Sequence, residues 1–191
     1  MFEIVRRSLK RGLVTEKDPF DQDKCGGYVV VHPASAAAEA AAGEEACVHP
    51  RRRFARRLRA QSLHIRHLDA GSCNACDFEM AALLNPVYDI QRLGFDFVAS
   101  PRHADIVLVT GAVTRNMELA VRRTYDAMPH PKIVIACGAC ACNKGAVGDG
   151  YAVIGKVADI LPVAIELPGC PPRPQDILQV LLAAREIYRT F

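Results

Sequence analysis

The chain has 191 residues, of which 50% are hydrophobic and 24% charged, and its formal net charge is +3. This length and composition are typical of a soluble globular protein with one domain and an appendage, or with two small domains at most. They argue against a membrane-spanning chain, because no apolar run approaches the length that crosses a bilayer.

Residues 1–60 are predicted to form an irregular, partly helical N-terminal extension. They hold 12 Lys and Arg against 8 Asp and Glu, whereas residues 61–191 hold 12 against 13. The extension opens with a short amphipathic helix over 1–13, offers one short strand within 26–33, and continues as an Ala-rich stretch over 34–46. No large apolar side chain anchors the Ala-rich stretch, so we expect contact with another subunit to order the extension.

The run "RRRFARRLR" at 51–59 carries most of the basic excess. Such a run can bind nucleic acid, an anionic membrane surface or an acidic partner, or it can be a solvated linker helix. No nucleic-acid-binding module accompanies it, so we predict no nucleic-acid partner. The first residues are too mixed for the apolar segment of a secretory signal, and we expect a cytoplasmic protein.

From residue 61 onward, strand and helix signals alternate. Short apolar runs rich in β-branched residues are typical of strands that are covered on both faces. Periodic apolar residues predict helices between them, one with Thr114 as its N-cap, one stopped by Pro86 and one with Pro174 near its start. The expected strands are 62–70, 104–111, 132–138 and 161–169, and the expected helices are 77–85, 114–128 and 174–191. This alternation predicts an α/β domain with a doubly wound, mostly parallel sheet over 61–191.

The stretch "GSCNACDFEM" at 71–80 places Cys73 and Cys76 directly after the first of these strands. Two cysteines at this spacing can be half of a metal site, a redox pair, or small residues of a turn. Thiols stay reduced in the cytoplasm, so the eight cysteines of the chain favour metal or redox chemistry over disulfides. Cys140 and Cys170 also lie just past strand ends, and the carboxyl ends of parallel strands share one edge of a sheet. We therefore expect these four thiols to meet at that edge.

Four convergent thiolates suit either a structural zinc ion or an iron–sulfur cluster. Zinc sites usually combine two closely spaced pairs, whereas one pair with two distant single cysteines favours a cubane cluster. Buried cysteines can also serve only as small apolar residues. Cys137 continues the alternation of the preceding isoleucines, so we expect it to face the core. Cys142 can be a spare thiol near the site, while Cys25 and Cys47 have no informative partner spacing.

Several motifs resemble a known family, the small electron-transfer subunit of the membrane-bound group 4 nickel–iron hydrogenases, including the formate hydrogenlyase type. The similar motifs follow the order of that family over about residues 61–187, and they are "GSCNACDFEM", "SPRHADIVLVTG", "TRNM", "CGAC" and "LPGCPPRPQDIL". The family is homologous to the 20 kDa iron–sulfur subunit of respiratory complex I. The resemblance implies a flavodoxin-like fold and one 4Fe–4S cluster, with the ligands Cys73, Cys76, Cys140 and Cys170.

The spacing of the first cysteine pair separates the two branches of this superfamily. Complex I proper has adjacent cysteines there, whereas the hydrogenase subunits have two residues between them, as Asn74 and Ala75 stand here. The resemblance therefore implies a single-electron relay beside the large catalytic subunit of a membrane-associated hydrogenase. The alternative is a 20 kDa-type subunit of a complex-I-like NADH:quinone oxidoreductase, and the remote alternative is a zinc-binding interaction module.

The resemblance also implies the partners of the chain. They are a large nickel–iron or complex-I-like catalytic subunit, a ferredoxin-like iron–sulfur subunit, and membrane subunits that hold the chain at the inner face of the cell membrane. The chain would be a subunit of an oxidoreductase and not catalytic alone.

Two carboxylates follow the second cysteine, and the resemblance implies a proton-relay carboxylate on the route to the nickel–iron site. Glu79 matches that position best and Asp77 less well, since Asp77 is equally natural as an acid at a helix N-terminus. Lys144 and Arg173 flank ligands and could favour the reduced cluster, or they are ordinary surface charges. No role is assigned to the lone histidines of this region, His64, His67 and His103.

Overall fold

The computed structural model of the protein describes residues 30–31, 61–145 and 148–191. It therefore covers most of the expected α/β domain and one dipeptide of the N-terminal extension. Several expectations lie outside the described residues: the helix over 1–13, the Ala-rich stretch, the basic run at 51–59, Cys25 and Cys47.

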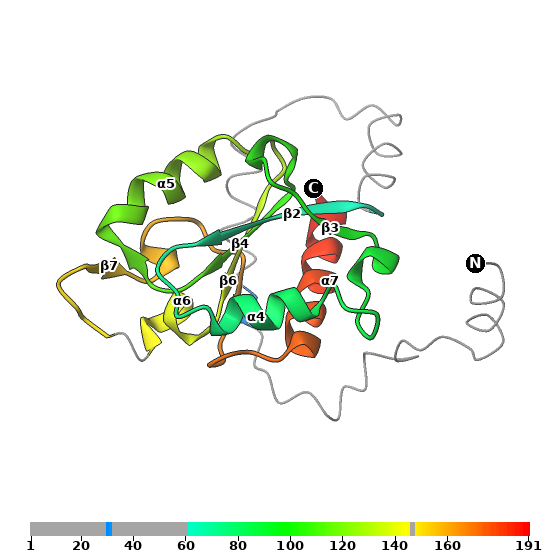
Figure 1. Ribbon diagram of the computed structural model, residues 1–191. Coiled ribbons are helices and arrows are strands. Elements are labelled where there is room, and N and C mark those ends of the chain that lie inside the picture. The colour runs from blue at the N-terminus through cyan, green and yellow to red at the C-terminus, as the bar shows by residue number, and fades with distance from the viewer. Residues whose placement is uncertain (1–29, 32–60, 146–147) are drawn as a thin grey trace, which may run out of the picture.

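The main sheet has six strands in the order β1-β8-β6-β4-β2-β3 (Figure 1). The strands are β1 (Val30–Val31), β2 (Leu63–Asp69), β3 (Phe95–Phe97), β4 (Ile106–Thr110), β6 (Ile133–Cys137) and β8 (Ile165–Leu167). The neighbouring strands from β8 to β3 are all parallel, and β1 pairs antiparallel with β8. Counted along the chain, the parallel strands lie in the flavodoxin-like order 2-1-3-4-5. The predicted α/β fold with a mostly parallel sheet is confirmed.

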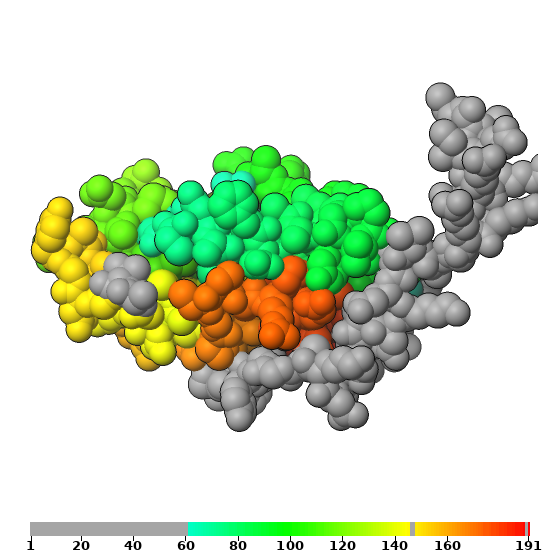
Figure 2. All heavy atoms as spheres, turned by 60° about the horizontal axis from the view of Figure 1, so that its bottom comes forward, coloured from blue at the N-terminus to red at the C-terminus, as the bar shows by residue number. Residues whose placement is uncertain are grey.

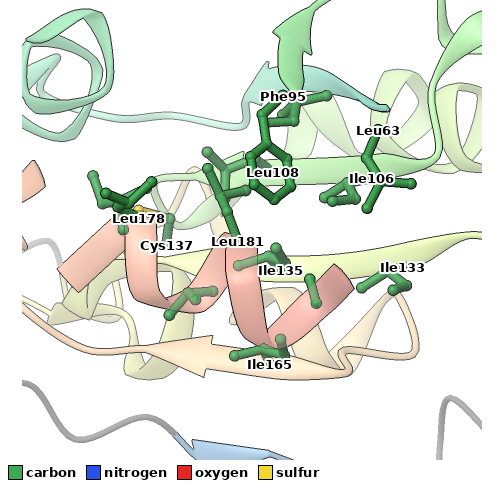
Figure 3. Close-up of a cluster of buried hydrophobic side chains, with 14 of the residues drawn as sticks. Leu63, Phe95, Ile106, Leu108, Ile133, Ile135, Cys137, Ile165, Leu178 and Leu181 are labelled. Carbon is green, nitrogen blue, oxygen red and sulfur yellow. The ribbon is translucent and has the colours of Figure 1, made fainter. Parts of the chain in front are cut away.

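Helices cover both faces of the sheet. The helices α4 (Ala75–Ala82) and α7 (Pro174–Thr190) lie on one face, and α5 (Arg115–Asp126) lies on the other (Figure 1). All residues of β4 and β6 are buried, as expected for strands that are covered on both sides. Because side chains alternate along a strand, β2, β4 and β6 each contribute to two apolar clusters, one on each face of the sheet. Figure 3 shows part of the cluster beneath α7, which includes Leu63, Phe95, Ile106, Leu108, Ile135, Ile165, Leu178 and Leu181.

Three short strands and one short α-helix of the described residues were not expected from the sequence. They are β3, the antiparallel pair β5 (Val113–Thr114) and β7 (Val153–Gly155), and the helix α6 (Ala139–Asn143). Each is too short for a periodic pattern of apolar residues to show. The strand β1, by contrast, matches the short strand expected within 26–33, and it pairs with β8 of this same chain although we expected its region to depend on another subunit.

Two helix ends differ from their predictions. The helix α4 ends at Ala82, ahead of Pro86, because the N–H groups of Leu83 and Leu84 already bond to carbonyl groups three residues back. Thr114 occupies the predicted N-cap position of α5, but its hydroxyl donates to the carbonyl oxygen of Ala70 (3.1 Å) and does not cap the helix. No helix among the described residues is both long and apolar enough to cross a membrane.

The central strands end in one row at their carboxyl edge. Asp69 lies beside Thr110, Thr110 beside Cys137, and Cys137 beside Leu167. The three loops that carry the predicted ligands start from this row, after β2, β6 and β8. The strand order reverses between β2 and β4, and ligands of open α/β sheets bind outside the carboxyl ends at such a switch point.

Candidate metal centre

The loop after β2 holds Cys73 in a turn built around Asp69. The Asp69 carboxylate accepts hydrogen bonds from the N–H groups of Gly71 (2.8 Å) and Ser72 (2.7 Å). Burial raises the pKa of Asp69, but the hydrogen bonds from Ser72 and Gly71 lower it by more than burial raises it. The pKa of Asp69 is therefore below its usual range. The Ser72 hydroxyl accepts the N–H of Asn74 (3.1 Å), so the backbone on both sides of Cys73 is tied to side chains.

Cys76, in the first turn of α4, packs against the loop after β6. A Cβ atom placed on Gly138 would lie 2.7 Å from Cys76 Sγ, closer than real contacts allow. Gly138 also has a φ of +96°, a backbone conformation that L residues rarely adopt. Because Gly138 has no side chain, the Cys76 thiol can occupy the space beside it. Its positive φ also allows the chain to turn toward Cys140.

Two backbone hydrogen bonds join the loop after β6 to the loop after β8. The N–H of Gly138 donates to the carbonyl oxygen of Leu167, and the N–H of Ala139 donates to that of Gly169, both across 2.7 Å. Figure 2 shows the three cysteine-bearing segments, teal at α4, yellow at α6 and orange before α7, side by side on one face of the molecule. The structure thus brings together the three loops that the sequence predicted to meet.

Cys73, Cys140 and Cys170 lie close enough to Cys76 to affect the ionisation of its thiol. Burial, and then the negative charges of Cys73, Asp77, Cys140 and Cys170, raise the pKa of the Cys76 thiol to about 11. Cys76 and Cys140 are half-buried, whereas Cys73 and Cys170 are exposed, so the site opens to the surface. A bound cation or metal cluster would relieve the mutual repulsion of four thiolates at this place.

The donor set fits an iron–sulfur cluster. Such clusters are held by cysteine thiolates, and four thiols from three loops are available at this edge. Gly138 supplies space that a side chain would otherwise fill. In residues 61–145 and 148–191, no group of three or more His, Cys, Asp or Glu side chains forms a site for a single metal ion. The assignment of Cys73, Cys76, Cys140 and Cys170 as cluster ligands stays a prediction.

Two further cysteines near this edge are buried. Cys137 lies in the core cluster that packs against α7, which confirms that it faces the core (Figure 3). Cys142 lies in the cluster on the opposite side of the sheet, and its thiol donates to the carbonyl oxygen of Ala136 (3.5 Å). Burial raises the pKa of Cys142 to about 12 and that of Cys137 well above its usual range. Both behave as small core residues, and neither is readily available as a thiolate.

Asp77 and Glu79 differ in their surroundings, because residues two apart on a helix do not face the same way. Asp77 accepts hydrogen bonds from the hydroxyls of Ser72 (3.2 Å) and Thr110 (3.1 Å), and its Oδ1 lies 3.1 Å from Nε2 of His67. Glu79 is half-buried, and it forms no hydrogen bond or ion pair with the other described residues. Asp77 is therefore fixed in a network, whereas Glu79 keeps its carboxyl group unengaged within this part of the chain.

Two of the polar partners of Asp77, His67 and Thr110, were missed in the sequence. His67 was given no role, and Thr110 was taken only as the end of an apolar strand. Two signals were available. His67 lies two positions after the buried Ile65, so its side chain points to the same face of the strand. Thr110 is the one polar residue of its strand and ends an otherwise apolar run. Neither signal alone indicates that the two side chains meet.

The two cations that flank predicted ligands are placed differently. Lys144 forms an ion pair with Asp149 in the loop after α6, so its charge is compensated within the chain. The backbone N–H of Arg173 donates to Asp176 (3.3 Å) at the start of α7, and Arg173 itself is exposed. The structure therefore supports ordinary ion pairing for Lys144 more than an influence on the cysteine site.

The chain matches a known protein family over residues 73–184. The family is described as the NADH ubiquinone oxidoreductase 20 kDa subunit. The matched stretch begins at Cys73 and contains all four converging cysteines.

Three curated relatives share 46% sequence identity with this chain. A probable membrane-bound hydrogenase subunit, mbhJ of Pyrococcus furiosus, aligns over 63% of this chain and 72% of its own length. Formate hydrogenlyase subunit 7 of Escherichia coli aligns over 60% of this chain and 45% of its own length. An NADH-quinone oxidoreductase subunit of Symbiobacterium thermophilum aligns over 60% of this chain and 64% of its own length.

A solved structure agrees with the fold and the sequence match. A chain of the membrane-bound sulfane sulfur reductase, an archaeal respiratory membrane complex, superposes with a TM-score of 0.64 and 32% identity. The superposition covers 72% of this chain and 76% of that chain. The relatives are thus subunits of oxidoreductase complexes, and they include both hydrogenases and quinone oxidoreductases.

Proposed function

The chain belongs to the family of the NADH ubiquinone oxidoreductase 20 kDa subunit, and we propose that it is an electron-relay subunit of a membrane-associated hydrogenase. In this proposal it holds one 4Fe–4S cluster beside the large catalytic subunit. The observation that carries the proposal is the meeting of three cysteine-bearing loops at the carboxyl edge of the sheet, within the residues that match the family.

The cysteines would each bind one iron of the cluster, and they are Cys73, Cys76, Cys140 and Cys170. When bound, the cluster supplies one-electron storage at a potential that hydrogen bonds, burial and nearby charge adjust. The chain fixes where the thiols lie, through the Asp69 turn and through the close contact of Gly138 with Cys76. The open side of the site, at the exposed thiols, is where a large subunit would exclude water.

The spacing of the first pair supports the hydrogenase assignment. Two residues separate Cys73 from Cys76, as in the hydrogenase subunits that the chain resembles. The complex-I-like alternative is retained for one specific reason: the membrane-bound hydrogenase subunit and the NADH-quinone oxidoreductase subunit are equally similar to this chain, at 46% identity. The zinc-binding interaction module stays a remote alternative, because the chain belongs to a family of oxidoreductase subunits.

Glu79 is the proposed proton-relay residue of the chain. It is half-buried on the helix that carries Cys76, and its carboxyl group is unengaged among the described residues. Such a carboxyl group can accept and release a proton next to a partner subunit. Asp77 is less suited to this role, because the hydroxyls of Ser72 and Thr110 already donate hydrogen bonds to its two carboxylate oxygens.

The remaining parts of the proposal concern assembly. Relatives are named as parts of membrane-bound complexes, which supports a peripheral location at the cytoplasmic face of the membrane through partner subunits. The partners would be the large subunit, a ferredoxin-like iron–sulfur subunit and membrane subunits. Residues 61–191 would form the iron–sulfur domain, and residues 1–60 an extension that contacts another subunit.

Hydrogen-dependent reduction of a viologen dye tests the proposed function. The native complex is purified anaerobically through an affinity tag on this chain, and nickel, iron, zinc and acid-labile sulfide are quantified in the same sample. Nickel together with hydrogen-dependent dye reduction is the expected result. Quinone reduction without nickel would move the chain to the complex-I-like alternative, and zinc without iron or sulfide would contradict both electron-transfer functions.

A further inference from the structure

The strand β1 belongs to the N-terminal extension, and it covers the outer edge of β8. Val30 lies opposite Glu166 and Val31 opposite Ile165 in an antiparallel pairing (β1 is blue and lies below β8 in Figure 3). On its other edge, β8 pairs with β6 through all three of its residues. Because β1 covers the outer edge, β8 is an interior strand of the sheet. The proposed relay function does not account for β1.

The sequence of β1 suits a short strand at the edge of a sheet. Val29, Val30 and Val31 are consecutive β-branched residues, which favour strands. Pro33 follows two positions after Val31, and a proline has no N–H group to donate to a further strand. β1 therefore occupies the edge that β8 would otherwise expose, and it adds only a short edge of its own.

The strand β8 leads into the loop that carries Cys170. Leu167 ends the strand, and its carbonyl oxygen accepts the N–H of Gly138 (2.7 Å). Two residues later, the carbonyl oxygen of Gly169 accepts the N–H of Ala139, also across 2.7 Å. Both bonds join the Cys170 loop to the loop after β6. The place of Cys170 therefore depends on where β8 lies against β6.

The hydrophobic core holds one face of β8 but leaves its outer edge unprotected. Ile165 and Leu167 are fully buried in the cluster beneath α7, whereas Glu166 between them is partly exposed. A three-residue strand at an open edge would separate from its neighbour more often than an interior strand, because water competes for its backbone groups. Pairing with β1 makes such local opening rarer at the start of the Cys170 loop.

The pairing of β1 with β8 is long-range in the sequence. Residues 32–62 link β1 to β2, and in the sheet the strands β8, β6 and β4 lie between these two. A link of this length does not hold β1 in place as a tight turn would. β1 can therefore leave β8 while the parallel strands stay paired with one another.

We propose that Val30 and Val31 are positioning residues of the four-cysteine site, and that they act through β8 on Cys170. While β1 is paired, β8 is held at both edges and the Cys170 loop stays bonded to the loop after β6. When β1 is released, β8 becomes an edge strand, the Cys170 loop opens more often, and a bound cluster is lost faster. This inference rests on the proposed relay function and makes the extension part of the structure that retains its cluster.

Two double variants of β1 test this role in the native complex. Val30→Pro with Val31→Pro removes both N–H groups of the strand. Val30→Thr with Val31→Thr is the matched control, because threonine keeps the N–H groups and the branched Cβ. Val30→Gly with Val31→Gly is a milder second test, because glycine keeps the N–H groups but disfavours strands. Its effects should have the same direction as those of the proline variant and be smaller.

Hydrogen–deuterium exchange measures the opening of β8 directly. In the proline variant, peptides that cover residues 165–167 should exchange about tenfold faster, as expected from the loss of one or two backbone hydrogen bonds. Peptides that cover β4, which lies beyond β6 in the sheet, should exchange as in the wild type. The threonine variant should match the wild type in both regions.

Cluster loss is followed on the same anaerobic preparations after a ferrous-iron chelator is added. The signal of this chain is the reduced EPR signal that Cys76→Ser removes. In the proline variant it should disappear about tenfold faster than in the wild type, in proportion to the opening of β8. In the threonine variant it should disappear at the wild-type rate.

Three results would overturn the proposal. The first is unchanged exchange of residues 165–167 in both the proline and the glycine variants. The second is faster exchange there without faster loss of the signal, and the third is equally faster exchange in β4, which would indicate general destabilisation. Failure of Cys76→Ser to remove any cluster signal would instead contradict the proposed relay function, while the exchange data would still test the effect of β1 on β8.

Discussion

The backbone N–H of Ala139 donates to the carbonyl oxygen of Gly169 across 2.7 Å. This hydrogen bond joins the residue before Cys140 to the residue before Cys170. Because Cys76 Sγ also packs against the glycine that precedes Ala139, the three cysteine loops form one structural unit. The geometry of the site thus depends on the loop backbone as well as on the thiols.

Alanine substitutions should separate ligands from core cysteines. Cys73→Ala and Cys170→Ala should each lose the cluster, because each removes one thiolate from the four-cysteine site. Cys137→Ala should keep it, because Cys137 is fully buried in the core beneath α7. Iron and acid-labile sulfide per chain, measured on anaerobically purified complexes, distinguish the variants. A cluster that is retained in Cys73→Ala or in Cys170→Ala would contradict the assignment of that cysteine as a ligand.

Gly138→Ala should reduce cluster content without removing any thiol. The added Cβ would lie 2.7 Å from Cys76 Sγ, and the φ of +96° would be strained for alanine. We expect less than half of the wild-type iron and sulfide per chain, as a rough estimate from a contact that must displace the thiol. Gly148→Ala is the control, because Gly148 also has positive φ (+61°) but has no atom within 4 Å of the added Cβ. Equal cluster content in the two variants would show that the close contact at Cys76 is unimportant.

Glu79→Gln should slow hydrogen-dependent dye reduction while the cluster signal remains. A positioned proton-transfer group typically contributes about 100-fold or more, and we expect a loss of that order. Glu118→Gln is the control, since Glu118 lies on α5 in an exposed ion pair with Arg122. Activity and the EPR signal are measured on the same preparations. Full activity of Glu79→Gln would remove the proton-relay role.

Tyr188→Phe should destabilise the domain at the end remote from the cysteines. The Tyr188 hydroxyl donates to Asp105 (2.9 Å), which also accepts the N–H of His64 (3.0 Å), so the bond ties α7 to the start of β4. Removing this part-buried hydrogen bond to a carboxylate should cost about 1–3 kcal/mol in the free energy of unfolding. Tyr151→Phe, at a side chain that is 91% exposed, should change it by less than about 0.5 kcal/mol. Urea unfolding curves of the purified chain compare the two, and equal midpoints would contradict the prediction.

The position of the cysteine site could be predicted from the sequence because of two physical constraints. The strands β4 and β6 are continuous apolar runs, which indicates a sheet covered on both faces. Parallel strands have a common carboxyl edge, so cysteines that follow different strands had to meet there. The burial of Cys137 followed from the alternation of side chains along β6.

The surroundings of the site could not be predicted in the same way. The contact of His67 with Thr110 depends on the register of β2 against β4, which are distant in sequence, and local periodicity does not define that register. The close approach of Gly138 to Cys76 depends on how α4 packs over the end of β6. The choice of Cys140 among the cysteines at 137, 140 and 142 rested on its place just past a strand end and on the family resemblance, and the sequence pattern left Cys142 open as a spare thiol.

The measurement that tests the central claim most directly compares the native complex with its Cys76→Ser variant. Both are purified anaerobically, analysed for iron, sulfide and zinc, and examined by low-temperature EPR after reduction. We predict that the variant contains about four iron and four sulfide fewer per chain and lacks one reduced 4Fe–4S signal, while the signals of partner subunits remain. Unchanged iron and an unchanged spectrum in an intact complex, or zinc in place of iron in the wild type, would contradict the claim that these cysteines hold an electron-relay cluster.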